Sequence, residues 1–413
     1  MQHQKRRFGI IFAVAIQRKV IIVVEKSRSY GRSICEGIIS FAARQGNWTL
    51  SSVRPEKLSV RDLKSADGAI VRIETETMAR KLRKTGIPVI DLYCERIRPG
   101  VHRVDCDHVE TGRLAAEYFL SHHFCNYAFC GFDGYPFSDT KRESYAQRLR
   151  EAGFTCHSYR PKDGRSQWSN LCFEEDADKA IDRPTLAAWL ESLPRPSAVF
   201  CCSDARACHV TTLCRELGLR VPQDISVLGV DDDRLLCSLS TPPISSISRY
   251  ATLVGETAAR TLNDLMEGRH DVPHLQIIPS GKVVERASTL FYPVDPPWLS
   301  RALAFIDQNV HEPIDANAVF DHIGVSHTAA ERIFRKELGT TVARRIAETK
   351  LREADRLIAT SDMRTYEIAD ALGYSSAAAF CRVYRRIRGH SPLQPRRALN
   401  PVDAQSPCKR KAI

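Results

Sequence analysis

Apolar residues in the first two thirds of the chain fall into two patterns that alternate along the sequence. Short unbroken runs such as Val20–Val24, in which every residue is β-branched, are typical of parallel strands buried on both faces. Longer stretches such as Gly31–Gln45 have the spacing of an amphipathic helix. We expect a first series with strands at Val20–Val24, Trp48–Val53, Ala69–Ile73 and Pro88–Leu92, and helices at Gly31–Gln45, Met78–Thr85 and Val109–His122.

A second series of the same kind follows. Helices of roughly 10–15 residues between strands predict parallel sheets with right-handed crossovers. Two such series therefore predict two lobes of similar fold with a cleft between them. The expected strands of the second series are Tyr127–Cys130, Ala198–Cys202 and Ile225–Val230, and its expected helices are Asp139–Ala152, Asp204–Leu217 and Leu253–Met266.

The strand pattern stops at Asp295-Pro296-Pro297, where adjacent prolines favour a stiff linker. The segment Trp298–Val310 has apolar residues at helical spacing, and no strand pattern appears after it. The predicted fold is therefore a two-lobed α/β domain followed by an all-α domain.

The chain has 413 residues, of which 43% are hydrophobic and 26% charged, as in ordinary globular proteins. Its longest apolar run, Phe8–Ile16, is shorter than the roughly 20 residues that a membrane helix needs. The run follows three basic residues, as in a signal peptide, but only Gln17, Arg18 and Lys19 separate it from the strand at Val20. We expect no association with a membrane and a cytoplasmic location.

Fourteen cysteines occur at irregular spacings and without a C-x-x-C pair. A zinc site or a disulfide framework usually shows tightly spaced pairs. The densest cysteine cluster, with His209 nearby, starts in an apolar run that reads as a buried strand. We interpret the cysteines as structural thiols in a reducing compartment, and we expect neither a metal site nor a cofactor. The cluster consists of Cys201, Cys202, Cys208 and Cys214.

The net charge of +11 is concentrated near the C-terminus. Residues 300–413 contain 19 basic and 13 acidic residues, so this last quarter carries more than half of the excess. From Cys381 onward there are nine basic residues and one acid, Asp403. A basic helical domain behind a nearly neutral body favours a nucleic acid as partner.

Two segments of this helical part, Val319–Ser326 and Ile368–Ser375, resemble each other. Each consists of a short helix and a glycine turn, at Gly324 or Gly373, and leads into a second amphipathic helix, which is a helix-turn-helix pattern. One such pattern is common in helical proteins. Two copies 49 residues apart, with a helix expected at Arg344–Ile358 between them, predict a DNA-binding domain.

The same region resembles the DNA-binding domain of the AraC/XylS family of bacterial transcription regulators. The resemblance implies that both second helices enter the major groove of DNA, with Ser326 and Ser376 capping them and presenting backbone amides to phosphates. It implies base contacts from Thr328, Glu331, Arg332, Ala378 and Arg382, and phosphate contacts from Arg385, Arg386 and Arg388. The segments that carry it are Glu367–Ala369, Leu372–Tyr374, Phe380–Arg386 and Gly389–Pro392.

The two lobes resemble the ligand-binding domain of the LacI/GalR family and of periplasmic sugar-binding proteins. Fusion of such lobes to an AraC-type domain is the layout of D-xylose-responsive activators, so the resemblance implies a small sugar effector, with D-xylose expected first. The segments that carry it are Ser138–Arg142, Cys202–Arg206, Ile225–Asp232, Thr241–Ile247 and Glu285–Thr289.

Ligands in α/β folds of this kind bind at the carboxyl ends of strands. Asp231 ends one expected strand, Asp204 follows another, and Ser27 follows the first. Charged side chains form strong hydrogen bonds with sugar hydroxyls, and aromatic rings can stack on a sugar face. Turn and capping roles remain an alternative, above all for Asp232 and Asp233. The predicted ligand-binding residues are Ser27, Tyr30, Ser138, Arg142, Asp204 and Asp231.

These observations predict a sequence-specific DNA-binding regulator of sugar catabolism genes. Its expected partners are promoter half-sites in DNA, the sugar, a second copy of the chain in a homodimer, and RNA polymerase. Activation is expected, and repression remains an alternative, as does a sugar-binding protein without a DNA function. An enzyme of the cysteine methyl-acceptor class would need a Pro-Cys-His-Arg setting, which is absent, so no catalytic residue is expected. The expected boundaries are an extension at 1–17, the sensor at 18–293, a linker at 294–299, the DNA-binding domain at 300–400 and a basic tail at 401–413.

Overall fold

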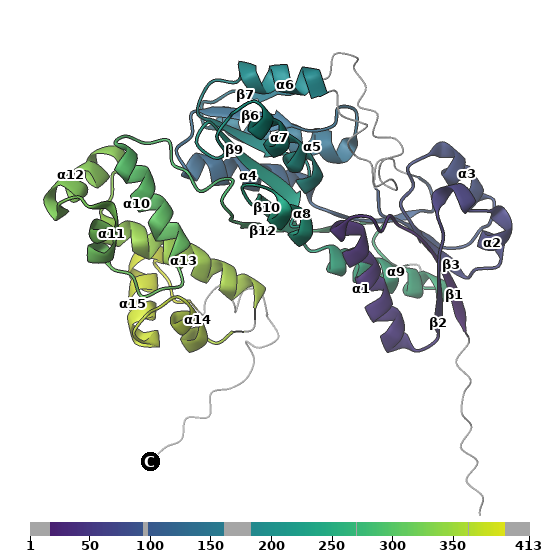
Figure 1. Cartoon of the computed structure of the whole chain (residues 1–413). Coiled ribbons are helices and arrows are strands. Elements are labelled where there is room, and N and C mark those ends of the chain that lie inside the picture. The colour runs from purple at the N-terminus through teal and green to yellow at the C-terminus, as the bar shows by residue number, and fades with distance from the viewer. Residues whose placement is uncertain (1–16, 94–97, 161–182, 270, 362, 393–413) are drawn as a thin grey trace, which may run out of the picture. The chain divides into compact units, whose positions relative to one another are not determined.

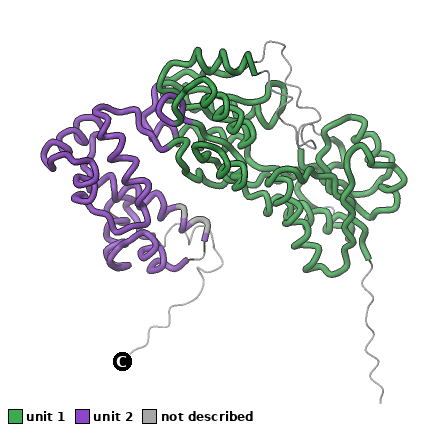
Figure 2. Tube along the Cα trace, viewed as in Figure 1, with its two compact units in different colours: residues 1–118, 126–221, 227–289 green, residues 119–125, 222–226, 290–413 purple. Residues whose placement is uncertain are grey.

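The structure is a computed structural model that describes residues 17–93, 98–160, 183–269, 271–361 and 363–392. The predicted extension at 1–17, apart from Gln17, and the basic tail at 401–413 lie outside the described residues. Figure 2 shows two compact units, and each is described here by itself. Unit 1 comprises residues 1–118, 126–221 and 227–289, and unit 2 comprises residues 119–125, 222–226 and 290–413.

The first sheet of unit 1 contains β1 (Arg18–Val23), β2 (Trp48–Ser52), β3 (Gly68–Val71), β4 (Val89–Asp91), β5 (His102–Cys106) and β11 (Leu275–Ile278). The strands are all parallel and lie in the order β11-β5-β4-β3-β1-β2. Alternate residues of β1 pack into different clusters: Ile22 packs with Ile34 on one face of the sheet, and Ile21 packs with Leu63 on the other. The predicted burial of this strand on both faces is confirmed.

The second sheet contains β6 (Asn126–Cys130), β7 (Cys156–Ser158), β8 (Ser197–Cys201), β9 (Ile225–Asp231), β10 (Ser245–Arg249) and β12 (Ser280–Val284). Its strand order is β12-β10-β9-β8-β6-β7, and β12 runs antiparallel to β10. All five residues of β8 are buried, including Val199 and Phe200. This sheet confirms the second series of strands that the sequence predicts.

Helices cover these sheets, as Figure 1 shows. Local signals in the sequence mark their ends. The helix after β1 ends at Gly46, whose φ of 74° is left-handed, and the side chains of Ser203 and Asp233 accept hydrogen bonds from the first turns of the helices that follow them. The helices are α1 (Ser29–Gln45), α2 (Val60–Lys64), α3 (Glu76–Arg83), α4 (His108–Ser121), α5 (Pro136–Glu151), α6 (Arg183–Ser192), α7 (Asp204–Glu216), α8 (Arg234–Leu239) and α9 (Ala251–Met266), with a 3-10 turn at Pro55–Lys57.

The order of elements along the sequence places helix α4 with the first sheet and helix α9 with the second. In the structure each of these two helices packs on the opposite sheet. The chain crosses between the sheets three times, from β5 to α4, from β10 to α9 and from β11 to β12. Helix α9 therefore returns to the first sheet, where Val254 and Leu262 join the same cluster as Ile22. Helix α4 packs with elements of the second lobe, since Tyr118 hydrogen-bonds Thr289. The prediction of two consecutive series was wrong on this point, because periodicity identifies an apolar face but not the sheet that buries it.

The three crossings are hydrogen-bonded to one another. The amide of Asp107, between β5 and α4, donates to the carbonyl of Ile278 at 2.8 Å. The hydroxyl of Ser280 donates to the carbonyl of Asp107 at 2.9 Å, and the amide of Lys282 donates to the hydroxyl of Ser248 at 3.0 Å. The segments that join the lobes are thus tied together by polar contacts.

Five strands, β5, β7, β10, β11 and β12, carry no clear strand pattern in the sequence. Strand β10 shows why, because two of its three buried positions are serines. The amide of Ser245 donates to Ser288 Oγ at 2.8 Å, and its hydroxyl lies 2.6 Å from Thr289 Oγ1. Partners distant in sequence satisfy these buried polar groups.

Unit 2 is helical and contains two cores. The first holds Leu303, Phe320 and Phe334, and the second holds Leu351, Ile368 and Phe380. The long helix between the helix-turn-helix units contributes to both cores, and both glycine turns are left-handed, with φ of 66° at Gly324 and 63° at Gly373. The helices are α10 (Pro297–Gln308), α11 (Ala316–Ile323), α12 (His327–Leu338), α13 (Val342–Thr360), α14 (Thr365–Ala371) and α15 (Ala377–Arg388).

Lys350 on α13 ties the two halves of unit 2 together. Its buried Nζ donates to the carbonyl of Glu312 at 2.6 Å and to the carbonyl of Leu372 at 2.8 Å. The second of these carbonyls is at the C-terminus of α14, where a cation is favoured. Helix α10 begins at Pro297, inside the segment expected as a linker.

Close packing of α1 on α9 supports the first sheet. A Cβ atom at Gly37 would lie 2.0 Å from the carbonyl oxygen of Thr252, so only glycine fits there. We predict that Gly37→Ala lowers the free energy of unfolding by about 1–3 kcal/mol, because the helices must separate. Urea denaturation measures this, with Glu36→Ala at an exposed position of the same helix as control. An unchanged or higher stability of Gly37→Ala would contradict the packing argument.

Candidate functional site

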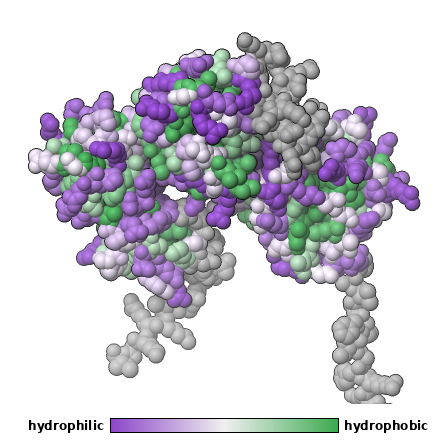
Figure 3. All heavy atoms as spheres, in the orientation of Figure 1, coloured by the Kyte–Doolittle hydropathy of each residue, from purple (hydrophilic) through white to green (hydrophobic). Residues whose placement is uncertain are grey.

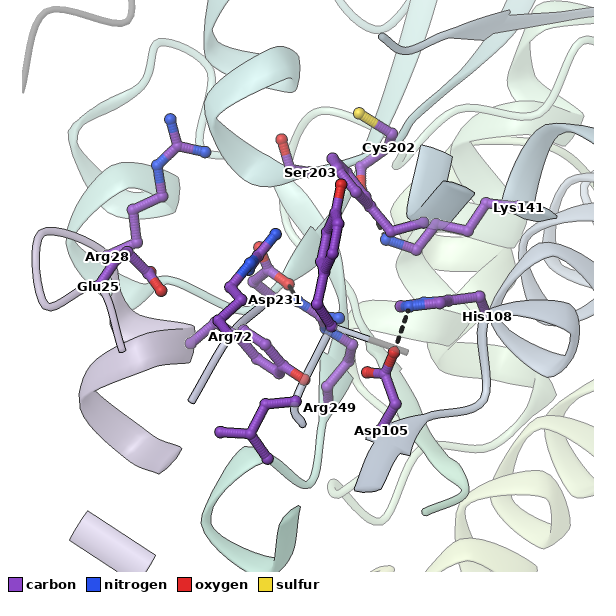
Figure 4. Close-up of a pocket in the computed structure, with 14 residues that line it drawn as sticks. Glu25, Arg28, Arg72, Asp105, His108, Lys141, Cys202, Ser203, Asp231 and Arg249 are labelled. Carbon is purple, nitrogen blue, oxygen red and sulfur yellow. Dashed lines mark hydrogen bonds and ion pairs between the residues drawn. The ribbon is translucent and has the colours of Figure 1, made fainter. Parts of the chain in front are cut away.

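A polar pocket opens in unit 1 where strands of both sheets end (Figure 4). Its empty space is about 580 Å³, counted out to its open side. The first lobe and its connection contribute Glu25, Arg28, Tyr30, Arg72, Leu92, Tyr93, Asp105 and His108, and the second lobe contributes Phe137, Lys141, Cys202, Ser203, Asp231 and Arg249.

The topology of the sheets brings these residues together. Glu25 and Arg72 follow β1 and β3, and His108 begins the helix after β5. Asp231 and Arg249 are the last residues of β9 and β10. The pocket therefore lies at the carboxyl ends of parallel strands, which is the usual ligand position in α/β folds.

An ion pair between Asp231 and Arg249 lies in the middle of the pocket. The two side chains are 13% and 8% exposed, and the Arg249 guanidinium also lies 3.5 Å from the ring centroid of Tyr30 on α1. Asp231 has a φ of 114°, a left-handed value that costs free energy in a residue with a Cβ atom. Such strain persists where the surrounding structure holds a side chain in a functional position.

The imidazole of His108 is partly buried beside a carboxylate. Its Nε2 lies 3.3 Å from an oxygen of Asp105, and its Nδ1 has no hydrogen-bond partner among the described residues. Burial lowers the pKa of His108, although Asp105 acts in the opposite direction. A neutral ring that donates from Nε2 offers Nδ1 as a buried acceptor for a ligand hydroxyl.

Glu25 is a second buried acceptor. It is 4% exposed, and its Oε2 has no hydrogen-bond partner among the described residues. Burial raises the pKa of Glu25 to about 7, although Arg72 and Arg28 act to lower it. The side chain can therefore exchange a proton near neutral pH.

Lys141 on α5 is 1% exposed and reaches the pocket from the second lobe. Its Nζ donates to the carbonyl of Cys202 at 2.9 Å and lies 5.3 Å from the ring centroid of Phe137. Burial, with Arg249 nearby, lowers the pKa of Lys141 to about 8.

The structure places two of the six ligand residues predicted from sequence, Tyr30 and Asp231, in the pocket wall. Asp204 and Ser138 are buried beside it in local hydrogen bonds: Asp204 accepts from the amide of Asp233 at 2.7 Å, and Ser138 accepts from the amide of Phe132 at 2.9 Å. Neither lines the pocket as described.

Ser27 is exposed and Arg142 lies outside the pocket wall. Arg142 pairs with Asp133 at 2.7 Å and with Asp139 at 2.9 Å. Its neighbour Lys141 faces the pocket instead, because one step along a helix turns the side chain direction by about 100°.

Sequence reasoning missed most of the charged pocket residues. Position after a predicted strand was the available signal for Glu25, whereas Arg72 lies inside the strand predicted at Ala69–Ile73, which ends at Val71 in the structure. No such signal existed for His108 and Arg249, because β5 and β10 were not predicted. Their contribution depends on the three chain crossings described above.

In unit 2, the second helices of both helix-turn-helix units present exposed polar faces. Thr328 and Arg332 are exposed on α12, and Ala378 and Arg382 occupy the corresponding exposed positions of α15. Arg385 and Arg386, one turn further along α15, are exposed as well.

The capping residues of these helices differ. Ser376 accepts a hydrogen bond from the amide of Ala379 at 3.2 Å, which confirms its predicted cap, whereas Ser326 makes no side-chain cap bond, contrary to the prediction. Ser326 is nevertheless exposed at the start of α12, next to the amides of its first turn. Glu331 is partly buried and accepts from the amide of Val342 at 3.3 Å, so it holds the start of α13.

Comparisons with known proteins agree with this architecture. Residues 116–289 match the model of the periplasmic binding protein-like domain, and residues 320–398 match that of a helix-turn-helix domain. The chain is a fusion of these two domains. The fusion predicted from the sequence is confirmed.

Similarity to known regulators extends over nearly the whole fusion. The xylose operon regulatory protein of Escherichia coli strain K12 is 24% identical over 394 residues, covering 92% of this chain and 97% of that protein. That of Haemophilus influenzae is 25% identical, covering 89% and 95%. A solved structure described as the xylose-binding transcription activator xylR has a TM-score of 0.58 at 23% identity, covering 93% of this chain and 99% of that one, and supports the fold.

The cysteines of the periplasmic binding protein-like domain are free thiols where the structure describes them. Cys201, Cys202 and Cys214 are buried, and within the described ranges the cysteine cluster near His209 brings no three metal-ligand atoms together. No described helix of the fusion is long and apolar enough to cross a membrane.

Glu25 makes stability depend on pH. Because its pKa is about 7 in the folded state and 4.5 in an unperturbed carboxyl, its protonated form stabilises the fold at low pH, and this contribution disappears as the pH rises through about 7. We predict that Glu25→Gln removes a pH-dependent loss of up to about 3 kcal/mol in the free energy of unfolding between about pH 5 and pH 8. Urea denaturation at both pH values measures it, with Glu36→Gln as the exposed control. An identical pH dependence in wild type and Glu25→Gln would contradict the burial argument.

Proposed function

We propose that this protein is a DNA-binding transcription regulator controlled by a small sugar effector that binds in the pocket of the periplasmic binding protein-like domain. The observation that carries the proposal is the presence, in one chain, of a polar pocket at strand carboxyl ends and of two helix-turn-helix units with exposed arginines. The similar regulators of Escherichia coli and Haemophilus influenzae are named for the xylose operon, so D-xylose is the reference effector. We assign residues 18–293 to the sensor, 294–299 to the linker and 300–400 to the DNA-binding domain.

In this proposal, α12 and α15 enter successive major-groove faces about 34 Å apart on DNA. Arg332 and Arg382 each pair with a guanine, and Thr328 and Ala378 contact neighbouring base edges. Arg385 and Arg386 contact phosphates, which adds affinity without sequence preference. The amides behind Ser326 and Ser376 bind phosphates, and Glu331 acts through its contact with α13.

The effector acts by favouring the closed arrangement of the two lobes. It shifts that equilibrium only by the difference between its affinities for the open and closed states. Closure changes the geometry of a homodimer and moves its DNA-binding domains onto adjacent half-sites, where the complex recruits RNA polymerase as an activator in the cytoplasm. A reporter fused to the target promoter distinguishes activation from repression.

Helix α8 offers a surface for the second copy. Leu235 and Leu239 lie one turn apart on it and are 64% and 73% exposed. Figure 3 shows hydrophobic residues on the molecular face where α8 lies. The two leucines are the most exposed large apolar side chains in the described part of the chain, and a contiguous patch of such side chains can mark an interaction site.

The DNA-binding prediction concerns two kinds of arginine. Arg332→Ala and Arg382→Ala should each weaken binding to the cognate operator by about tenfold or more, because each loses a bidentate contact with a base. Arg386→Ala should weaken binding to all DNA sequences alike and reduce the salt dependence by about one counterion. Fluorescence anisotropy with operators selected from a random DNA pool, and with scrambled DNA, measures both effects.

Arg344 on α13 supplies the matched control, since it is exposed and pairs with Glu348 at 2.8 Å. Arg344→Ala should leave operator affinity unchanged. If wild type shows no preference for any DNA sequence, the proposed function is wrong. If Arg332→Ala weakens operator and scrambled DNA equally, that residue contacts phosphate and not a base.

The dimer prediction concerns α8. The double variant Leu235→Glu, Leu239→Glu should reduce the mass in solution from that of two chains to that of one, because carboxylates cannot be buried without partners. Light scattering after size exclusion measures the mass, and Leu275→Glu at another exposed leucine is the control. A double variant that remains dimeric would place the interface elsewhere, and a wild-type monomer would contradict the homodimer.

A further inference from the structure

Positive charge exceeds negative charge in the pocket wall. Four residues that line it are arginine or lysine, and three are acidic, although one of the cations, Arg72, pairs with Glu74 outside the wall at 2.8 Å. Two of the acids already face partners inside the protein: Asp231 pairs with Arg249, and Asp105 lies beside His108. The third, Glu25, is buried and takes up a proton near neutral pH. The cationic residues are Arg28, Arg72, Lys141 and Arg249.

Lys141 is a pocket cation that lacks a nearby carboxylate as counter-ion among the described residues. Its ammonium group is buried, has one hydrogen-bond acceptor, the carbonyl of Cys202, and lies within 4 Å of no carboxylate in the described part of the chain. An ammonium group has three donors, so two remain for a ligand. A buried cation without a counter-ion is costly, and an anionic ligand would offset that cost.

A second cation and several uncharged contacts surround the same space. The Nε atom of Arg249 is buried and has no hydrogen-bond partner among the described residues. Glu25 Oε2 and His108 Nδ1 are likewise without partners there and offer positions for hydroxyl groups. Figure 4 shows Lys141 and Arg72 reaching toward the middle of the pocket from opposite sides.

We propose that the effector is an anionic sugar derivative, whose acidic group is held by Lys141 and Arg249 and whose hydroxyl groups are held by Glu25, His108 and Asp231. This inference rests on the proposed function and names the ligand class of its pocket. The shared chemistry is a polyhydroxylated anion, and the negative group is either a carboxylate, as in a sugar acid, or a phosphate. A neutral sugar of the same skeleton leaves the ammonium group of Lys141 without a counter-ion.

Calorimetric titration of the full chain with matched ligand pairs tests the proposal. The carboxylate arm compares D-glucuronate with D-glucose, and the phosphate arm compares D-ribose 5-phosphate with D-ribose. We expect the acidic member of a pair to bind at least about tenfold more tightly than its neutral counterpart. The reason is that hydrogen bonds between charged groups are stronger than hydrogen bonds between neutral groups. Whichever arm shows this difference identifies the negative group.

Two variants separate the role of the charge from that of the fold. Lys141→Met should weaken binding of the acidic ligand by about tenfold or more, and Lys141→Arg should retain most of it. Lys81→Met is the matched control, because Lys81 also donates to a backbone carbonyl, that of Leu58, and lies outside the pocket. Thermal unfolding and operator binding without effector show whether each variant is folded.

Three results would overturn the inference. They are a neutral sugar binding as tightly as its acid, acid binding that survives Lys141→Met unchanged, and no binding of any acidic sugar. Tight binding of D-xylose itself would leave a xylose-responsive regulator and remove only the anionic effector. Failure of the proposed function is a separate outcome, because it appears as loss of sequence preference in the DNA-binding measurement.

Discussion

The buried contact among Asp231, Arg249 and Tyr30 is the interaction on which the pocket depends. Asp231 ends β9 and Arg249 ends β10 in the second sheet, whereas Tyr30 belongs to the helix that covers the first. A guanidinium is planar and remains charged, so it can pair with a carboxylate and stack on a ring at once. One side chain therefore links the two lobes at the point where a ligand would lie.

The position of this contact follows from the path of the chain. Three crossings between the sheets lie close together and are hydrogen-bonded through Asp107, Ser248 and Ser280. The carboxyl ends of strands from both sheets meet beside them, so a ligand that contacts both lobes also acts on the crossings. A ligand can favour one lobe arrangement only through contacts that differ between arrangements. Side chains from both lobes around one pocket supply that difference.

The helical unit depends on a different constraint. Its two small cores would be marginal if separate, because a short chain buries little apolar surface. Helix α13 contributes side chains to both, and Lys350 joins the loop before α11 to the end of α14 through two carbonyl groups. The spacing of the two exposed helices, α12 and α15, is therefore set by packing and not by a flexible connection.

The sequence by itself determined the helices and strands with a clear apolar periodicity, the fold class and the paired helix-turn-helix units, because these depend on local periodicity, glycine turns and capping residues such as Ser376. It also identified two pocket residues, Asp231 from its place at a strand end and Tyr30 as an aromatic ring able to stack on a sugar face. Only the tertiary structure decided that α9 packs on the first sheet, that Lys141 and not Arg142 lines the pocket, and that Arg249 lies there at all. These three outcomes depend on the crossings of the chain between the sheets and on the direction in which each side chain of α5 points. They also depend on polar strands such as β10, whose buried serines form hydrogen bonds with segments distant in sequence.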